Sequence, residues 1–151
     1  MRLVVAVVSC TLFAAGCGGS ERPVSLVATW DGPVPPYPAS GVLPVAAFRA
    51  YQTAVDEPWE QTPEDVSVEY VQPDRFDAQL VSASWDPVEE GVVDAVVLAQ
   101  KLPDDSVRDL RFVLRLRLDR EGNVWVLQSA RWSQRCWPGR GHQSFSTQFC
   151  V

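Results

Sequence analysis

The chain has 151 residues, of which 46% are hydrophobic and 21% are charged. This composition is typical of one globular domain, and it excludes a chain that is disordered throughout. The formal net charge is −6, and His142 is the single histidine. The acidic balance excludes a nucleic-acid backbone as the main partner, and the single histidine excludes any mechanism that needs two.

The N-terminal segment is typical of an exported protein. Arg2 carries a positive charge, and the uncharged run Leu3–Ala15 that follows is 13 residues long. A lasting transmembrane helix needs about 20 apolar residues, so this pattern indicates a secretory signal peptide instead. The end of the run, Phe-Ala-Ala-Gly-Cys at residues 13–17, resembles a bacterial lipobox. The resemblance implies that the peptide is cut before Cys17 and that the Cys17 thiol is lipidated.

A second segment, Val-Val-Ser-Cys at residues 7–10, also looks like a lipobox. Cleavage before Cys10 would leave an apolar run of only about seven residues, the lower limit for a signal peptide. We therefore predict a signal peptide at residues 1–16 and a lipid at Cys17, with Cys10 or an unlipidated signal as the alternatives. The lipid would hold the exported protein on the outer face of the cytoplasmic membrane.

Residues 17–43 are predicted to form a tether and an extended arm. Six prolines interrupt any regular element between residues 23 and 44. The one candidate strand in this part is residues 24–29, directly before Trp30. The globular domain is accordingly predicted to span residues 44–151.

Two helices are predicted at the start of that domain. The first covers residues 44–57, where Pro44 suits a first helical position and Phe48 and Tyr51 fall on one face. The second begins after Thr62, which suits an N-cap before a proline and two acidic residues, and it extends to residue 71.

Beyond residue 76 the apolar residues recur with a period of two, which indicates strands. In the clearest strand Phe112 and Leu114 point one way, and Arg111, Arg115 and Arg117 point the other. Short turns make consecutive strands antiparallel neighbours. The four predicted strands cover residues 78–85, 91–100, 110–118 and 124–133.

Helices followed by a meander predict an α+β domain, with one or two helices packed on a curved antiparallel sheet of four or five strands. This order resembles the NTF2-like, or cystatin-like, cone. Such folds host both enzymes and binding modules, so the resemblance implies no particular activity.

Two cysteines, Cys136 and Cys150, remain once Cys10 leaves with the signal peptide and Cys17 carries a lipid. Because an exported chain meets an oxidising compartment, we predict a disulfide between them, closing a loop of about 15 residues. The alternative is a zinc site that includes His142, but a closed zinc site needs four ligands. We predict no metal and no cofactor.

The segment Cys136–Gln143, Cys-Trp-Pro-Gly-Arg-Gly-His-Gln, followed by Cys150, carries a family resemblance. Together with two weaker stretches, residues 57–63 and 104–112, it resembles a group of actinobacterial lipoproteins of unassigned function. The resemblance covers most of residues 44–151 and implies export, lipidation and a small α+β domain. No activity is established for the group, so it transfers no functional residue.

The Gly-Arg-Gly-His part of this segment offers a candidate ligand site. Glycine-rich backbone can cradle an anion, and Arg140 with His142 could clamp a carboxylate or phosphate. We favour the structural alternative, in which both side chains bond backbone carbonyls and hold the loop on the sheet. Ser144 or Ser146 near His142 could belong to a catalytic triad, but no Gly-x-Ser-x-Gly motif is present, and we predict no catalytic residue.

Charge is distributed unevenly along the domain. Residues 56–94 hold twelve acidic residues and one arginine, whereas residues 108–140 hold eight arginines and three acidic residues. Arg111, Arg115 and Arg117 are therefore expected to pair with acids across the sheet. The alternatives are an arginine-lined concave face that binds an anionic envelope component, and attraction of these arginines to membrane headgroups.

These observations predict a membrane-anchored envelope lipoprotein with a small non-catalytic binding or scaffolding domain. Its partners would be the membrane, through the Cys17 lipid, and an envelope protein or a small anionic ligand, but no nucleic acid. The alternative is an NTF2-like hydrolase or isomerase with Arg140 and His142 in a pocket. The two hypotheses differ in whether the interior of the fold is filled by side chains or hollow.

Overall fold

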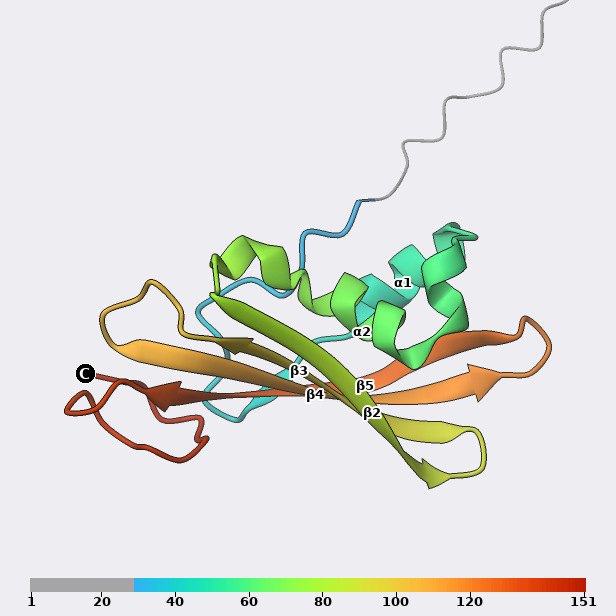
Figure 1. Cartoon of the computed structure of the whole chain (residues 1–151). Coiled ribbons are helices and arrows are strands. Elements are labelled where there is room, and N and C mark those ends of the chain that lie inside the picture. Colours follow the sequence, from blue (N-terminus) through green and yellow to red (C-terminus); the bar gives the residue numbers. More distant parts are fainter. Residues whose placement is uncertain (1–28) are drawn as a thin grey trace, which may run out of the picture.

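The computed structural model describes residues 29–151. The predicted signal peptide, Cys17 and all but the last residue of the candidate strand at residues 24–29 lie outside this range. Two α-helices precede four of the five strands of an antiparallel sheet, so the predicted α+β class is confirmed (Figure 1).

The first α-helix is shorter than predicted from the sequence, and the second begins and ends where it was predicted. In the second, the Thr62 hydroxyl accepts a hydrogen bond of 3.1 Å from the Asp65 backbone N–H, as expected of an N-cap. In the first, Val45 offers no side-chain cap, and the helix begins after it. Within residues 29–151 no helix is long and apolar enough to cross a membrane. The helical segments are α1 (Ala46–Ala54), the 3-10 turn η1 (Pro58–Gln61), α2 (Pro63–Val71) and the 3-10 turn η2 (Pro73–Phe76).

The sheet is a meander with one additional short strand at its edge. The strand order is β1-β5-β4-β3-β2, and every neighbouring pair is antiparallel. Strand β1 lies inside the stretch predicted as an arm, where it pairs with Ala130 and Arg131 of β5. The strands are β1 (Val42–Leu43), β2 (Leu80–Glu89), β3 (Val92–Gln100), β4 (Val107–Asp119) and β5 (Val124–Cys136).

The core lies between the helices and one face of the sheet. Phe48 of α1 and Tyr70 of α2 are fully buried, with ring centroids 5.1 Å apart in an edge-to-face arrangement. Fully burying one such side chain stabilises the fold by about 1.5–3 kcal/mol. The sheet contributes a continuous apolar layer, with Val97, Phe112, Leu114, Leu116 and Leu127 all 0% exposed.

The proline-rich arm packs against this core. The Trp30 indole N–H donates a hydrogen bond of 2.8 Å to the backbone carbonyl of Tyr70. The Tyr37 ring lies edge-on to Phe112, with centroids 5.8 Å apart. Arg75 also donates hydrogen bonds to backbone carbonyls of the arm. The described chain therefore begins on the helix-covered side of the sheet, as Figure 1 shows.

Candidate functional site

The two faces of the sheet differ because both helices lie on the same side of it (Figure 1). Along β4 the buried residues alternate with arginines that point to the helix-free face. Arg115 and Arg117 are exposed there, and Arg111 is half-buried. This alternation places all three arginines named in the sequence on one face.

The expected pairing of arginines with acids across the sheet occurs at one of the three positions. Arg115 faces Asp94 of β3 and donates two hydrogen bonds of 2.8 Å to its carboxylate. These hydrogen bonds hold the pKa of the Asp94 carboxyl below its ordinary value. Arg111 and Arg117 instead face Leu98 and Val92, so the register leaves them opposite apolar residues.

Arg111 is held by two contacts of another kind. Its Nε donates a hydrogen bond of 3.1 Å to the Ser133 hydroxyl on β5. Its guanidinium carbon lies 4.6 Å from the centre of the Phe145 ring, and that of Arg135 lies 4.9 Å from the same ring. Phe145 therefore contacts two guanidinium groups, an arrangement favoured by the ring quadrupole.

Asp109 fixes Arg135 from the side of β4. Its side chain is 1% exposed and accepts hydrogen bonds from Arg108 (2.8 Å), Arg135 (2.7 Å) and the backbone N–H of Lys101 (3.1 Å). Burial raises the pKa of Asp109, but these hydrogen bonds outweigh burial and hold the pKa below its ordinary value. The carboxylate is therefore charged and fully partnered.

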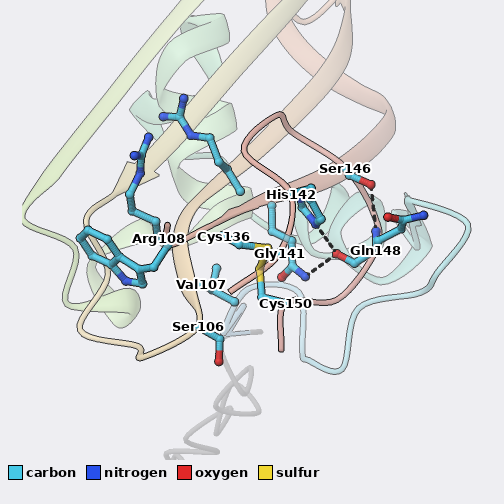
Figure 2. The surroundings of a disulfide bond; sticks show 12 residues. Ser106, Val107, Arg108, Cys136, Gly141, His142, Ser146, Gln148 and Cys150 are labelled. Atoms are coloured by element: carbon cyan, nitrogen blue, oxygen red, sulfur yellow. Dashed lines mark hydrogen bonds between the residues drawn. A yellow bond between two sulfur atoms is a disulfide. The ribbon is translucent and has the colours of Figure 1, made fainter. Parts of the chain in front are cut away.

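The predicted disulfide between Cys136 and Cys150 is present, with Cα atoms 5.5 Å apart (Figure 2). The loop that it closes continues the edge of β5 beyond β1. Gln134 and Ser146 exchange backbone hydrogen bonds of 2.8 and 2.9 Å, and the Cys136 N–H donates to the His142 carbonyl at 3.0 Å. The loop thus covers the backbone groups at the end of β5.

His142 is bonded within this loop, as the structural alternative expected. Its Nδ1 lies 2.7 Å from the Ser144 carbonyl oxygen, and its Nε2 lies 2.8 Å from that of Gln148 (Figure 2). A neutral imidazole donates one of these two hydrogen bonds, and a charged one donates both. The same expectation was wrong for Arg140, whose side chain is exposed and bonds no carbonyl of the described residues; only its backbone N–H donates, to the Trp137 carbonyl.

Cys136, His142 and Cys150 lie close together, with possible ligand atoms within 4.8 Å of one another. Thiolates bind metals, whereas these two sulfur atoms are joined to each other. Gly141 completes the packing, because a Cβ there would lie 3.0 Å from the Cys136 sulfur and its φ of 131° suits glycine. The cluster therefore holds the disulfide loop in its conformation.

The hollows on the surface of the described residues include the following three. One of about 520 Å³ lies beside the two turns at one end of the sheet, and its lining mixes arginines with Glu90, Asp119 and Glu121. Another of about 450 Å³ lies between the arm and α1. Arg140 and His142 line none of the three.

The remaining hollow, of about 370 Å³, lies on the helix-free face where β4, β5, the arm and the disulfide loop meet. We call it the arginine hollow. Its lining includes Arg111, Arg131, Ser133, Phe145 and Thr147. Arg111 was named from the sequence, but Arg131, Phe145 and Thr147 were not. Alternation along β5 could have placed Arg131 on this face, whereas no sequence signal places Phe145 between two arginines.

Comparison of the chain with protein-family models, with curated proteins and with solved structures found no match. The resemblance to actinobacterial lipoproteins therefore stays a prediction.

Proposed function

We propose that this protein is a membrane-anchored envelope lipoprotein whose α+β domain acts by binding, through the helix-free face of its sheet. The observation that carries the proposal is the contrast between the two faces. The helix-covered face is filled by apolar side chains, while the opposite face presents Arg111 and Arg117 without acidic partners across the sheet. A surface of this kind suits recognition of an external ligand.

The filled interior favours binding over the alternative of an NTF2-like enzyme. An enzyme of that kind needs a cavity with a reactive polar group inside it. Phe112 and Leu114, at the centre of the sheet, are 0% exposed beneath the helices. His142 is engaged by two carbonyl oxygens in the disulfide loop, away from this interior.

The position of the arm agrees with a membrane tether. Trp30 is bonded to Tyr70 on the helix-covered side, so the chain reaches the domain from that side. The 12 residues from Cys17 to Ala28 can span at most about 40 Å. Such a tether leaves the helix-free face, on the opposite side of the domain, open to a ligand.

The anchor is tested by metabolic labelling with a fatty-acid analogue in cells that express the chain. We expect label in the unaltered protein and in Cys10→Ser, and none in Cys17→Ser. Because Cys10 lies in the same segment, it is a matched control for loss of a thiol. Persistent label in Cys17→Ser would refute the anchor at this residue.

The binding face is tested by placing a photo-crosslinking residue at one of two exposed positions. Ser129 faces outward on β5 opposite Arg115, and Thr53 lies on α1 in the helix layer. We expect crosslinked adducts in cells from position 129 and none above background from position 53. Adducts from position 53 alone, or equally from both, would overturn the assignment of the face.

A further inference from the structure

We propose that the arginine hollow binds a phosphate group, carried either by a small phosphorylated molecule or by a lipid headgroup. This inference rests on the proposed function, because it names the chemistry of the ligand that the helix-free face would recognise. The hollow is built from three parts of the chain that are distant in sequence: the arm, the strands β4 and β5, and the disulfide loop.

Two arginines give the hollow its charge. Arg111 lies opposite Ser133, and Arg131 lies opposite Val113, so the two arginines are diagonal neighbours on the same face. The four ion pairs within residues 29–151 use Arg108, Arg115, Arg120 and Arg135, which leaves Arg111 and Arg131 without a carboxylate.

The nearby carboxylate of Asp109, two residues before Arg111 on β4, is already bonded to Arg108 and Arg135. Within the described part of the chain, no acidic residue lines the arginine hollow. The larger hollow beside the turns differs, because Glu90, Asp119 and Glu121 offset the arginines in its lining. The chain has a net charge of −6, but the charged residues that line this hollow are all arginines. The hollow is therefore locally positive and favours an anion.

Arg111 is oriented before any ligand arrives. Its Nε is occupied by the Ser133 hydroxyl, and its plane is held against Phe145. Its two terminal nitrogens are left to donate to an anion, and less side-chain entropy is lost when they do so. Arg135, the second arginine in contact with Phe145, forms an ion pair with the buried Asp109. This ion pair helps to hold the Phe145 ring in place.

The hydroxyl groups of the hollow favour phosphate over a simple carboxylate. Ser40 and Ser146 accept hydrogen bonds from the backbone N–H groups of Val42 (3.4 Å) and Gln148 (3.1 Å), so their own O–H protons remain to be donated. Thr147 adds a third hydroxyl to the lining. Two guanidinium groups and several hydroxyls match the three or four acceptor oxygens of a phosphate group.

The rest of the ligand would lie against apolar walls. The side chains of Phe145 and Val113 line the same hollow. Carbon atoms next to the phosphate, from a glycerol or a sugar, can contact these side chains without losing the charged contacts. A glycerol phosphate, free or as part of a lipid, is therefore a suitable probe.

The test uses the full chain, purified in a detergent with an uncharged headgroup, and titration calorimetry at constant ionic strength. The two probes are glycerol 3-phosphate and the short-chain lipid dihexanoyl phosphatidylglycerol, with sodium acetate as the carboxylate control. We expect saturable binding of at least one phosphate probe and weaker binding of acetate. The tighter of the two probes identifies a free phosphate or a lipid headgroup as the source.

Matched variants distinguish binding in the arginine hollow from a general attraction of the anionic probe to arginines on this face. We expect Arg131→Gln and Arg111→Gln each to weaken binding of the better probe at least about tenfold. Arg131→Gln is the cleaner variant, because Arg111 also supports Phe145. Arg117→Gln removes the same charge from the same face outside this hollow, and we expect binding within about twofold of wild type.

The inference is overturned if neither phosphate probe binds saturably, if acetate binds as tightly, or if Arg117→Gln weakens binding as much as Arg131→Gln. Its failure can be told apart from failure of the proposed function. If no phosphate probe binds but position 129 gives crosslinked adducts, the phosphate proposal is wrong and the proposed binding face stands. Intact phosphate binding together with persistent label in Cys17→Ser would remove only the anchor at Cys17.

Discussion

The two faces of the sheet are built from alternate residues of the same strands, yet they differ in burial and charge. On β4, Phe112 and Leu114 are fully buried beneath the helices. Their neighbours Arg111 and Arg115 point to the helix-free face, where Arg115 is exposed and Arg111 is half-buried. The difference shows that this small domain places most of its apolar core on one side of the sheet and leaves charged side chains on the other.

Among the described residues, the disulfide loop covers one end of the helix-free face. There the loop brings Phe145 onto Arg111 and Arg135, while Asp109 is buried below it. Cover at one end and exposure elsewhere create the arginine hollow at the boundary. The contrast between the faces can therefore be tested by substitutions on each face and at this boundary.

The largest effect is expected on the helix-covered face. Phe112→Ala removes a ring that contacts Tyr37 and Phe76, and it should lower the free energy of unfolding by about 4 kcal/mol. Val113→Ala, one residue along and on the opposite face, should cost less than about 1 kcal/mol. Urea denaturation followed by far-UV circular dichroism measures both. Equal losses would mean that both faces are structural.

The next effect concerns the buried carboxylate at the boundary. Asp109→Asn leaves the side chains of Arg108 and Arg135 without their anion and should destabilise the fold by about 3 kcal/mol at neutral pH. Because folding lowers the pKa of Asp109, its contribution is present above the unfolded pKa of about 3.9 and is lost as pH falls through the folded value.

The pH dependence separates this role from a purely steric one. The difference in unfolding free energy between wild type and Asp109→Asn should be largest above about pH 5 and shrink toward pH 3. It can be measured by urea denaturation at each pH. A difference that stays constant over this range would show that the charge of Asp109 does not stabilise the fold.

Most of the sheet could be predicted from the sequence because alternation is a local signal. The strand expected at residues 110–118 is β4 at 107–119, and the one expected at 91–100 is β3 at 92–100. Strand β5 extends three residues beyond the expected end, since the disulfide loop bonds Gln134 and Cys136. Strand β1 was missed, because two residues between prolines carry no periodic pattern.

The candidate site was less predictable, because its contacts join distant segments. Arg111 and its outward direction follow from alternation along one strand. Its neighbours depend on the register between β4 and β5, and Phe145 depends on the path of the disulfide loop. Asp109 was not singled out, because only the folded chain surrounds its carboxylate with two arginines. Of the three arginines that were expected to pair with acids across the sheet, only Arg115 does so.

A smaller loss is expected when the disulfide loop is released. Replacing Cys136 and Cys150 by serine should lower the free energy of unfolding by about 3 kcal/mol or less, because the unfolded chain regains the freedom of a loop of about 15 residues. The double variant and the wild type treated with reductant should give the same urea midpoint. A midpoint unchanged in both would show that the loop is held by its hydrogen bonds alone.

The smallest effect is expected in the middle of the helix-free face. Asp94→Asn removes the partner of Arg115, but the two side chains are 34% and 50% exposed, and ion pairs in contact with water contribute little. Although the pKa of Asp94 is lowered, as that of Asp109 is, solvent and salt screen its charge. We expect a urea midpoint close to that of wild type in 0.5 M salt, and a measurable decrease only at low salt. A large, salt-independent loss would mean that the pair is part of the structural framework, and the helix-free face could then no longer be treated as a surface whose charges are kept for a ligand.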